Sequence, residues 1–189
     1  NQNNHPFVGK VAEKPFALAH NGVLWNDKTL HFTENLPKTS IETDSYIAVQ
    51  LLEKLNALDF DSLRSMAETV EGSFVFTVLD NEDSIWFVVG ENPLCIMCYD
   101  GFLLYASTRE ILRKAIKRLR LGKAKEALEP KEGEILRIDR HGQLTKGQFT
   151  PSMVPRWGYP KYTDWQHHAA ENDTGCDDLF AAAKMFGIL

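Results

Sequence analysis

The chain has 189 residues with a formal net charge of −5, and its composition is 43% hydrophobic and 25% charged. These values are typical of one globular domain with a real core. The negative net charge argues against a broad nucleic-acid-binding surface. No apolar run approaches the roughly 18–20 residues that span a bilayer. We therefore expect neither nucleic acid nor membrane as a partner. The polar start at Asn1, without Met, predicts a cut or processed end of a longer chain.

Three cysteines, Cys95, Cys98 and Cys176, are too few and too odd in number for a disulfide scaffold, and they indicate a reducing, cytoplasmic location. Cys95 and Cys98 have Cys-x-x-Cys spacing, but no second pair completes a zinc site. Their neighbours predict a strand, whereas a redox pair is expected at a helix N-terminus. The adjacent His167 and His168 lack a third spaced ligand. We therefore predict no metal site.

The hydrophobic pattern predicts short elements of both kinds. In chain order they are a buried strand at 16–19, a tight turn at Asn21–Gly22, a helix after Thr43–Ser45 with Ile47, Leu51 and Leu55 inward, a second helix with Leu63, Met66, Ala67 and Val70 inward, strands at 73–80 and 85–89, a hairpin at 94–99 and 102–106, a helix opened by a capping box at 107–110, and strands at 133–139 and 143–149. Two helical layers enclosing mostly antiparallel strands fit this order, which is an α+β arrangement of four layers.

The C-terminal part differs in character from the rest. We predict one domain at residues 1–150, followed by an irregular tail at 151–189 that is rich in Pro and aromatic residues and ends in a short helix at about 177–186. The basic stretch at 113–120 keeps helical spacing in its apolar residues. That spacing favours a solvated helix face over a nucleic-acid-binding surface.

Several short motifs carry a resemblance when they are taken in order. They are residues 4–7 (NHPF), 19–26 (AHNGVLWN), 42–45 (ETDS), 72–74 (GSF), 90–94 (GENPL), 105–112 (YASTREIL) and 133–135 (GEI). Each is weak alone, but the ordered set resembles class II glutamine amidotransferases, the glutaminase domains of glucosamine-6-phosphate synthase, glutamine phosphoribosylpyrophosphate amidotransferase and asparagine synthetase. The resemblance covers roughly residues 4–139.

The resemblance implies a four-layer αββα sandwich of the N-terminal nucleophile hydrolase type. In such enzymes the first residue is a Cys whose thiolate attacks the side-chain amide of glutamine, and its own α-amine, with a pKa near 7.7–8, serves as the base. A glutamyl thioester and ammonia form, and water then releases glutamate. This chemistry needs no metal and no organic cofactor.

The resemblance also implies roles for particular residues. The Asn21 side-chain amide and the Gly22 N–H would be the oxyanion donors, and Asp44 would hold the α-ammonium of glutamine. His20, with His5, would position the site. Each has a plainer alternative, since an Asn-Gly pair often forms a turn, an Asp before a helix often caps it, and a His is often structural.

Two parts of the family's site are absent from the sequence as printed. No Cys precedes the motif at 4–7, and the Arg that grips the α-carboxylate is absent as well. Asn1 cannot act as a nucleophile, and Cys95 and Cys98 are predicted to lie in a strand far along the chain. We therefore expect the nucleophile upstream of residue 1, and we expect the 189 residues alone not to hydrolyse glutamine.

The leading hypothesis is a glutamine amidotransferase that binds glutamine and releases ammonia or passes it to a synthase domain or a separate subunit; an oligomer is compatible with it. One alternative is a related amidohydrolase that acts on γ-glutamyl or other amides. The other is a non-catalytic binding module on the same fold.

Overall fold

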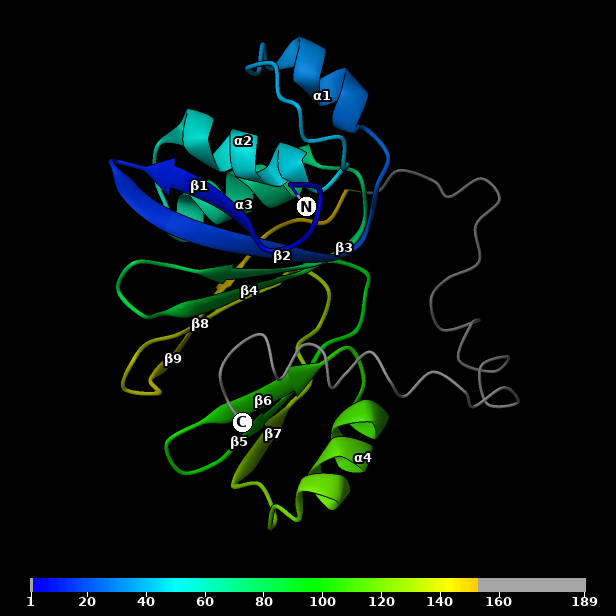
Figure 1. The fold of residues 1–189 in the computed structure, drawn as a ribbon, viewed down its shortest axis with the longest axis vertical. Helices are drawn as coiled ribbons and strands as arrows, with labels where there is room; N and C mark the ends of the chain where they lie inside the picture. Colours follow the sequence, from blue (N-terminus) through cyan, green and yellow to red (C-terminus); the bar gives the residue numbers. More distant parts are fainter. Residues whose placement is uncertain (1, 153–189) are drawn as a thin grey trace, which may run out of the picture. The chain divides into compact units, whose positions relative to one another are not determined.

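The computed structural model describes residues 2–152, which form four helices and nine strands in two antiparallel sheets (Figure 1). The predicted α+β class is confirmed. None of the helices in this range has the length and apolar character that crossing a membrane requires. The predicted tail beyond Ser152, with its short helix at 177–186, lies outside the described residues.

The larger sheet has six strands, and β2 is its longest. In order across the sheet they are β1 (Phe7–Val11), β2 (Lys14–Leu24), β3 (Gly72–Leu79), β4 (Ile85–Val89), β8 (Glu134–Ile138) and β9 (Leu144–Gln148). β3 pairs with β2 through to Leu24, whereas the pairing of β1 with β2 stops where Phe7 lies opposite Leu18. The last six residues of β2 therefore have no described strand on the β1 side.

Two helices, α2 (Tyr46–Leu55) and α3 (Phe60–Thr69), cover one face of this sheet (Figure 1). α1 (Asp27–Thr33) packs against α2 instead. α3 begins with a capping box, in which the Asp59 carboxylate accepts from the Ser62 N–H and the Ser62 hydroxyl accepts from the Asp59 N–H. α2 ends at Asn56 in the left-handed conformation, which closes the last turn.

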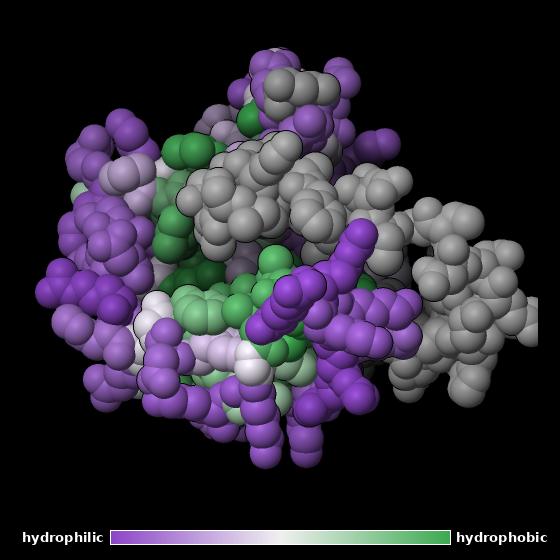
Figure 2. Space-filling view, turned by 60° about the horizontal axis from the view of Figure 1, so that its bottom comes forward, coloured by the Kyte–Doolittle hydropathy of each residue, from purple (hydrophilic) through white to green (hydrophobic). Residues whose placement is uncertain are grey.

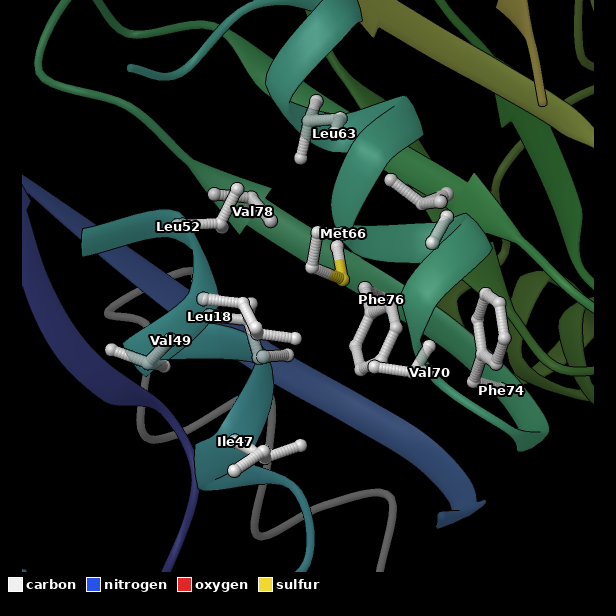
Figure 3. Close-up of a cluster of buried hydrophobic side chains, with 14 of the residues drawn as sticks. Leu18, Ile47, Val49, Leu52, Leu63, Met66, Val70, Phe74, Phe76 and Val78 are labelled. Atoms are coloured by element: carbon white, nitrogen blue, oxygen red, sulfur yellow. The ribbon is translucent and has the colours of Figure 1, made fainter. Parts of the chain in front are cut away.

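The main core lies between α2, α3 and the larger sheet (Figure 3). Its fully buried side chains come from alternate positions of the strands and from the inward faces of the helices; they include Leu18, Phe76 and Val78 of the sheet and Leu52, Leu63 and Met66 of the helices. Strand alternation places the same-face neighbours of Leu18 against the helices as well. This packing fixes β2, which carries the candidate site.

The smaller sheet packs against the other face of the larger one. Its strands are β6 (Leu103–Ala106), β5 (Cys95–Cys98) and β7 (Glu126–Leu128), and α4 (Arg109–Leu119) covers its outer face. Ile96 of β5 packs with Phe87 and Leu136 of the larger sheet, while Met97 packs with Leu112 of α4. The layers therefore run helix, sheet, sheet, helix.

Most predicted elements are present, but three were missed, and a predicted capping box and a predicted tight turn are wrong. The missed elements are β1, α1 and β7, all of seven residues or fewer. The capping box predicted at 107–110 is wrong, because the N-cap is Thr108, whose hydroxyl accepts from the Ile111 N–H at 3.3 Å. The predicted helices at α2, α3 and α4 are confirmed.

Candidate active site

Asn21 and Gly22 do not form the predicted tight turn. Both lie inside β2, where Asn21 pairs with Val75 and Gly22 pairs with Phe74 of β3. Gly22 has φ = +146°, and a Cβ built there would lie 1.9 Å from the Ser73 carbonyl oxygen. Only glycine tolerates both the backbone conformation and this close approach. The residue type at position 22 therefore follows from the strand geometry, not from a turn.

The free edge of β2 presents a row of main-chain N–H groups. The His20 N–H donates to His5 Nδ1 at 3.3 Å, and the Leu24 N–H donates to Asp44 Oδ2 at 2.6 Å. Successive N–H groups of a strand alternate between its two edges, so the Gly22 N–H points to the same side as those of His20 and Leu24. No described strand pairs with this edge beyond Leu18. The Gly22 N–H thus lies between two polar contacts, on an edge with which no described strand pairs.

The Asn21 side chain leaves β2 in a different direction. Asn21 lies opposite Val75, whose side chain packs in the cluster between the two sheets, so the Asn21 side chain belongs to the inter-sheet face. It is exposed, as is Gly22. A side-chain amide and a main-chain N–H therefore stand on neighbouring residues at one exposed end of β2, as an oxyanion site requires.

Asp44 is joined to β2 through its carboxylate. Oδ2 accepts from the Leu24 N–H, and Oδ1 accepts from the Ser45 N–H at 2.8 Å and the Ser45 hydroxyl at 3.2 Å. A carboxylate has about four acceptor positions, so one position on Oδ2 remains for a ligand. α2 has Ser45 as its N-cap without a side-chain cap bond, and the Thr43 hydroxyl is buried without a partner. Neither Thr43 nor Ser45 therefore caps α2 with its side chain.

His20 is held between α2 and the core. Its Nδ1 and the Ser45 hydroxyl are hydrogen-bonded at 2.8 Å, and its ring lies 4.8 Å from that of Phe76. The Ser45 hydroxyl also lies 3.2 Å from Asp44 Oδ1, so it joins His20 to Asp44. Burial lowers the pKa of His20 to about 4, although the Asp44 carboxylate and the nearby Ser73 carbonyl oppose this shift. His20 is therefore neutral at pH 7.

The two cysteines of the Cys-x-x-Cys motif lie on β5, as predicted. Cys95 packs towards α4 and Cys98 packs towards the larger sheet, so their side chains leave opposite faces of the strand. Their Cα atoms are about 10 Å apart in an extended strand, beyond the roughly 7 Å limit for a disulfide. Burial raises the pKa of both thiols. Within residues 2–152 no group of three or more His, Cys, Asp or Glu side chains could hold a metal ion.

Known proteins resemble this chain both in sequence and in fold. Over 112 residues, 56% of the chain, it is 34% identical to glutamine–fructose-6-phosphate aminotransferase (isomerizing) from Oceanobacillus iheyensis, and the match spans 18% of that relative. The fold matches glutamine phosphoribosylpyrophosphate amidotransferase from B. subtilis with a TM-score of 0.65 and 20% identity, covering 81% of this chain and 33% of that one. A glutamine aminotransferase class-II domain protein from Silicibacter pomeroyi matches with a TM-score of 0.53 and 15% identity, covering 79% of this chain and 72% of that one. No protein-family model matches the chain.

In sequence and in fold the chain is similar to class II glutamine amidotransferase domains, and it spans 18% and 33% of the first relative and the first solved structure. The family prediction made from the motifs is thereby confirmed. The structure brings the four residues predicted for an amidotransferase site into one neighbourhood, because Asp44 bonds to the main chain of β2 and Ser45 joins Asp44 to His20. The roles of Asn21, Gly22, Asp44 and His20 stay predictions.

Two further residues of this candidate site were missed from the sequence. Ser45 is 4% exposed and bridges His20 and Asp44. Asn92 is 6% exposed, and its Nδ2 donates to the Asn21 carbonyl oxygen at 2.8 Å. The motif at 90–94 contained Asn92, but nothing in the sequence indicates that a residue 71 positions along the chain reaches the strand that carries Asn21.

The low pKa of His20 predicts a loss of stability in mild acid. In the unfolded chain the ring takes up a proton near its ordinary pKa of 6.5, whereas the folded chain resists protonation down to about pH 4. Folding therefore becomes less favourable as the pH falls from 6.5 to 4, by up to about 3 kcal/mol. Denaturant unfolding at several pH values should show a flatter decline for His20→Gln. The exposed His141→Gln should follow the wild type, and parallel curves for wild type and His20→Gln would contradict the assignment.

Proposed function

We propose that the chain is the glutamine-hydrolysing part of a class II glutamine amidotransferase, with the four-layer αββα sandwich of the N-terminal nucleophile hydrolase type. The observation that carries the proposal is the free edge of β2. There the Gly22 N–H is directed outward two residues before Leu24, whose N–H holds the Asp44 carboxylate. A donor for a developing oxyanion and an acceptor for an ammonium thus lie along one strand edge.

The spacing of these two groups suits glutamine. Alternate residues of a strand are about 6.6–6.8 Å apart, which sets the distance between the N–H groups of Gly22 and Leu24. An extended glutamine places its side-chain amide about 5–6 Å from its α-nitrogen, given bonds near 1.5 Å. Glutamine can therefore direct its amide oxygen to Gly22 and Asn21 while its ammonium approaches Asp44. A ligand without an α-amine would leave Asp44 unused.

The attacking thiolate must come from outside residues 2–152. Cys95 and Cys98 lie on β5 with raised pKa values, and their side chains leave opposite faces of that strand. Ser45 lies beside His20, but its hydroxyl is buried and already bonded to His20 and Asp44. We propose a Cys upstream of residue 1, whose own α-amine accepts the thiol proton.

Several apolar side chains between the two sheets are exposed. On the inter-sheet face Val23 is 55%, Leu79 50% and Tyr105 41% exposed, although residues on such a face are normally buried. One side of the molecule also carries apolar surface bordered by hydrophilic side chains (Figure 2).

In this reaction the thiolate attacks the amide carbon, and the amide oxygen becomes an oxyanion held by Asn21 and Gly22. Collapse of the tetrahedral intermediate breaks the C–N bond, and the proton taken by the α-amine passes to the leaving ammonia. Water then cleaves the thioester to glutamate. The ammonia passes to an acceptor domain or subunit in the cytoplasm, or is released.

The substrate class is tested by comparing glutamine with γ-glutamyl dipeptides in the protein at its natural full length. We expect ammonia release from glutamine to exceed amine release from the dipeptides. The 189-residue chain is the control and should release no ammonia. Faster turnover of dipeptides would favour the related amidohydrolase, and glutamine binding without turnover at full length would favour the non-catalytic module; either outcome would overturn the proposal.

A further inference from the structure

Asn92 is a buried polar residue at the crossing between the two sheets. It lies in the connection from β4 to β5, outside both strands, and is 6% exposed. Its Nδ2 donates to the Asn21 carbonyl oxygen at 2.8 Å. A buried amide costs free energy unless its hydrogen bonds are made, and the contact with β2 provides one of them.

The contact acts on the peptide group that carries the candidate oxyanion donor. The carbonyl of Asn21 and the N–H of Gly22 belong to one planar, trans peptide, in which oxygen and hydrogen point in opposite directions. A donor that fixes the oxygen therefore also fixes the direction of the N–H. Hydrogen bonds through one peptide polarise each other by about 10–30% per bond, so the Gly22 N–H also becomes a stronger donor.

The glycine at position 22 makes this contact possible. A Cβ at Gly22 would lie 2.8 Å from Asn92 Nδ2, in addition to its clash with the Ser73 carbonyl. The absence of a side chain thus lets the Asn92 amide approach the peptide from one side while the N–H stays open on the other. Gly22 and Asn92 form a matched pair around one peptide bond.

We propose that Asn92 is a positioning residue that holds and polarises the Asn21–Gly22 peptide for oxyanion binding. The catalytic part of this inference rests on the proposed glutamine hydrolysis. The structural part, that Asn92 sets the environment of the Gly22 N–H, stands without it. Asn92 does not touch the substrate and acts through the main chain of β2.

The decisive variant is Asn92→Asp, which keeps the size of the side chain but replaces the donor with an acceptor facing a carbonyl oxygen. In the full-length protein we expect kcat for glutamine to fall about tenfold or more, the kinetic equivalent of one lost hydrogen bond, with KM changed less than twofold. The Gly22 amide signal in a proton–nitrogen NMR spectrum without substrate should also shift. Asn92→Ala should give the same changes in a smaller form.

The matched control is Ser84→Ala. Ser84 is 1% exposed and its hydroxyl accepts from Arg137 at the hairpin between β3 and β4, so it is another buried polar contact, away from Asn21. It should lower the melting temperature without changing kcat or the Gly22 signal. Unchanged kcat in Asn92→Asp, or a Gly22 shift no larger than in the control, would overturn the inference. If the wild type releases no ammonia, the proposed function fails, and the Gly22 signal alone then decides whether Asn92 holds this peptide.

Discussion

Replacing Asn21 with alanine is expected to lower kcat for glutamine hydrolysis about 100- to 1,000-fold, the usual cost of losing one oxyanion donor. KM should change little, because the Asn21 amide meets an oxygen that becomes charged only in the transition state. The fold should tolerate the change, since the side chain is exposed and the contacts of Asn21 with β3 and Asn92 use its main chain. Steady-state ammonia release from the full-length protein measures the effect.

Val23→Ala provides the control for this experiment. Val23 is two residues further along β2, on the same face as Asn21, and is also exposed. Its variant should keep kcat near the wild-type value. Equal kcat in the two variants would show that Asn21 contributes no more than an ordinary strand residue and would remove it from the site.

Replacing Asp44 with asparagine is expected to raise KM for glutamine about 10- to 150-fold, as for the loss of a hydrogen bond between charged groups. The structure favours asparagine over alanine as the replacement at position 44. The Asp44 carboxylate also accepts from the N–H groups of Leu24 and Ser45, so alanine would leave two donors without a partner. Asparagine removes the charge and keeps one acceptor oxygen, so only one of the two N–H groups loses its partner. kcat at saturating glutamine should fall much less than KM rises.

Asp59→Asn is the matched control, because the Asp59 carboxylate likewise accepts from a backbone N–H, at the start of α3. It should lower the melting temperature by a similar amount and leave KM unchanged. An unchanged KM in Asp44→Asn would mean that Asp44 only ties α2 to β2, and the ammonium would then need another partner.

Residues with strong local patterns could be predicted from the sequence. The fourfold spacing of Ile47, Leu51 and Leu55 predicts α2, and the long apolar run from Phe74 to Leu79 predicts β3. α1 could not be predicted in the same way, because its apolar Phe32 is 87% exposed and its start lacks a side-chain cap bond. Short elements of this kind depend on their place in the fold more than on their own pattern.

The tight turn predicted at Asn21–Gly22 is absent for a specific physical reason. The local preference of Asn-Gly for a hairpin turn is overridden by pairing of both residues with β3, which brings the Ser73 carbonyl against Gly22. Asn21 and Gly22 remain the proposed oxyanion donors, because the strand geometry still offers a side-chain amide and an exposed N–H at these two positions. The bridge through Ser45 and the contact of Asn92 join segments far apart in the chain, and a single sequence carries no signal for such contacts.

The central claim is that the open end of β2 is the glutamine site and that a cysteine from elsewhere attacks there. A diazoketone analogue of glutamine keeps the α-amino acid part and alkylates a thiolate held at the amide position, so it reports on both. Incubation of the full-length protein with this analogue, followed by peptide mass mapping, should show one modified Cys upstream of residue 1, with glutamine protecting it and Asp44→Asn slowing its labelling. Labelling of Cys95 or Cys98, or no labelling at all, would contradict the account.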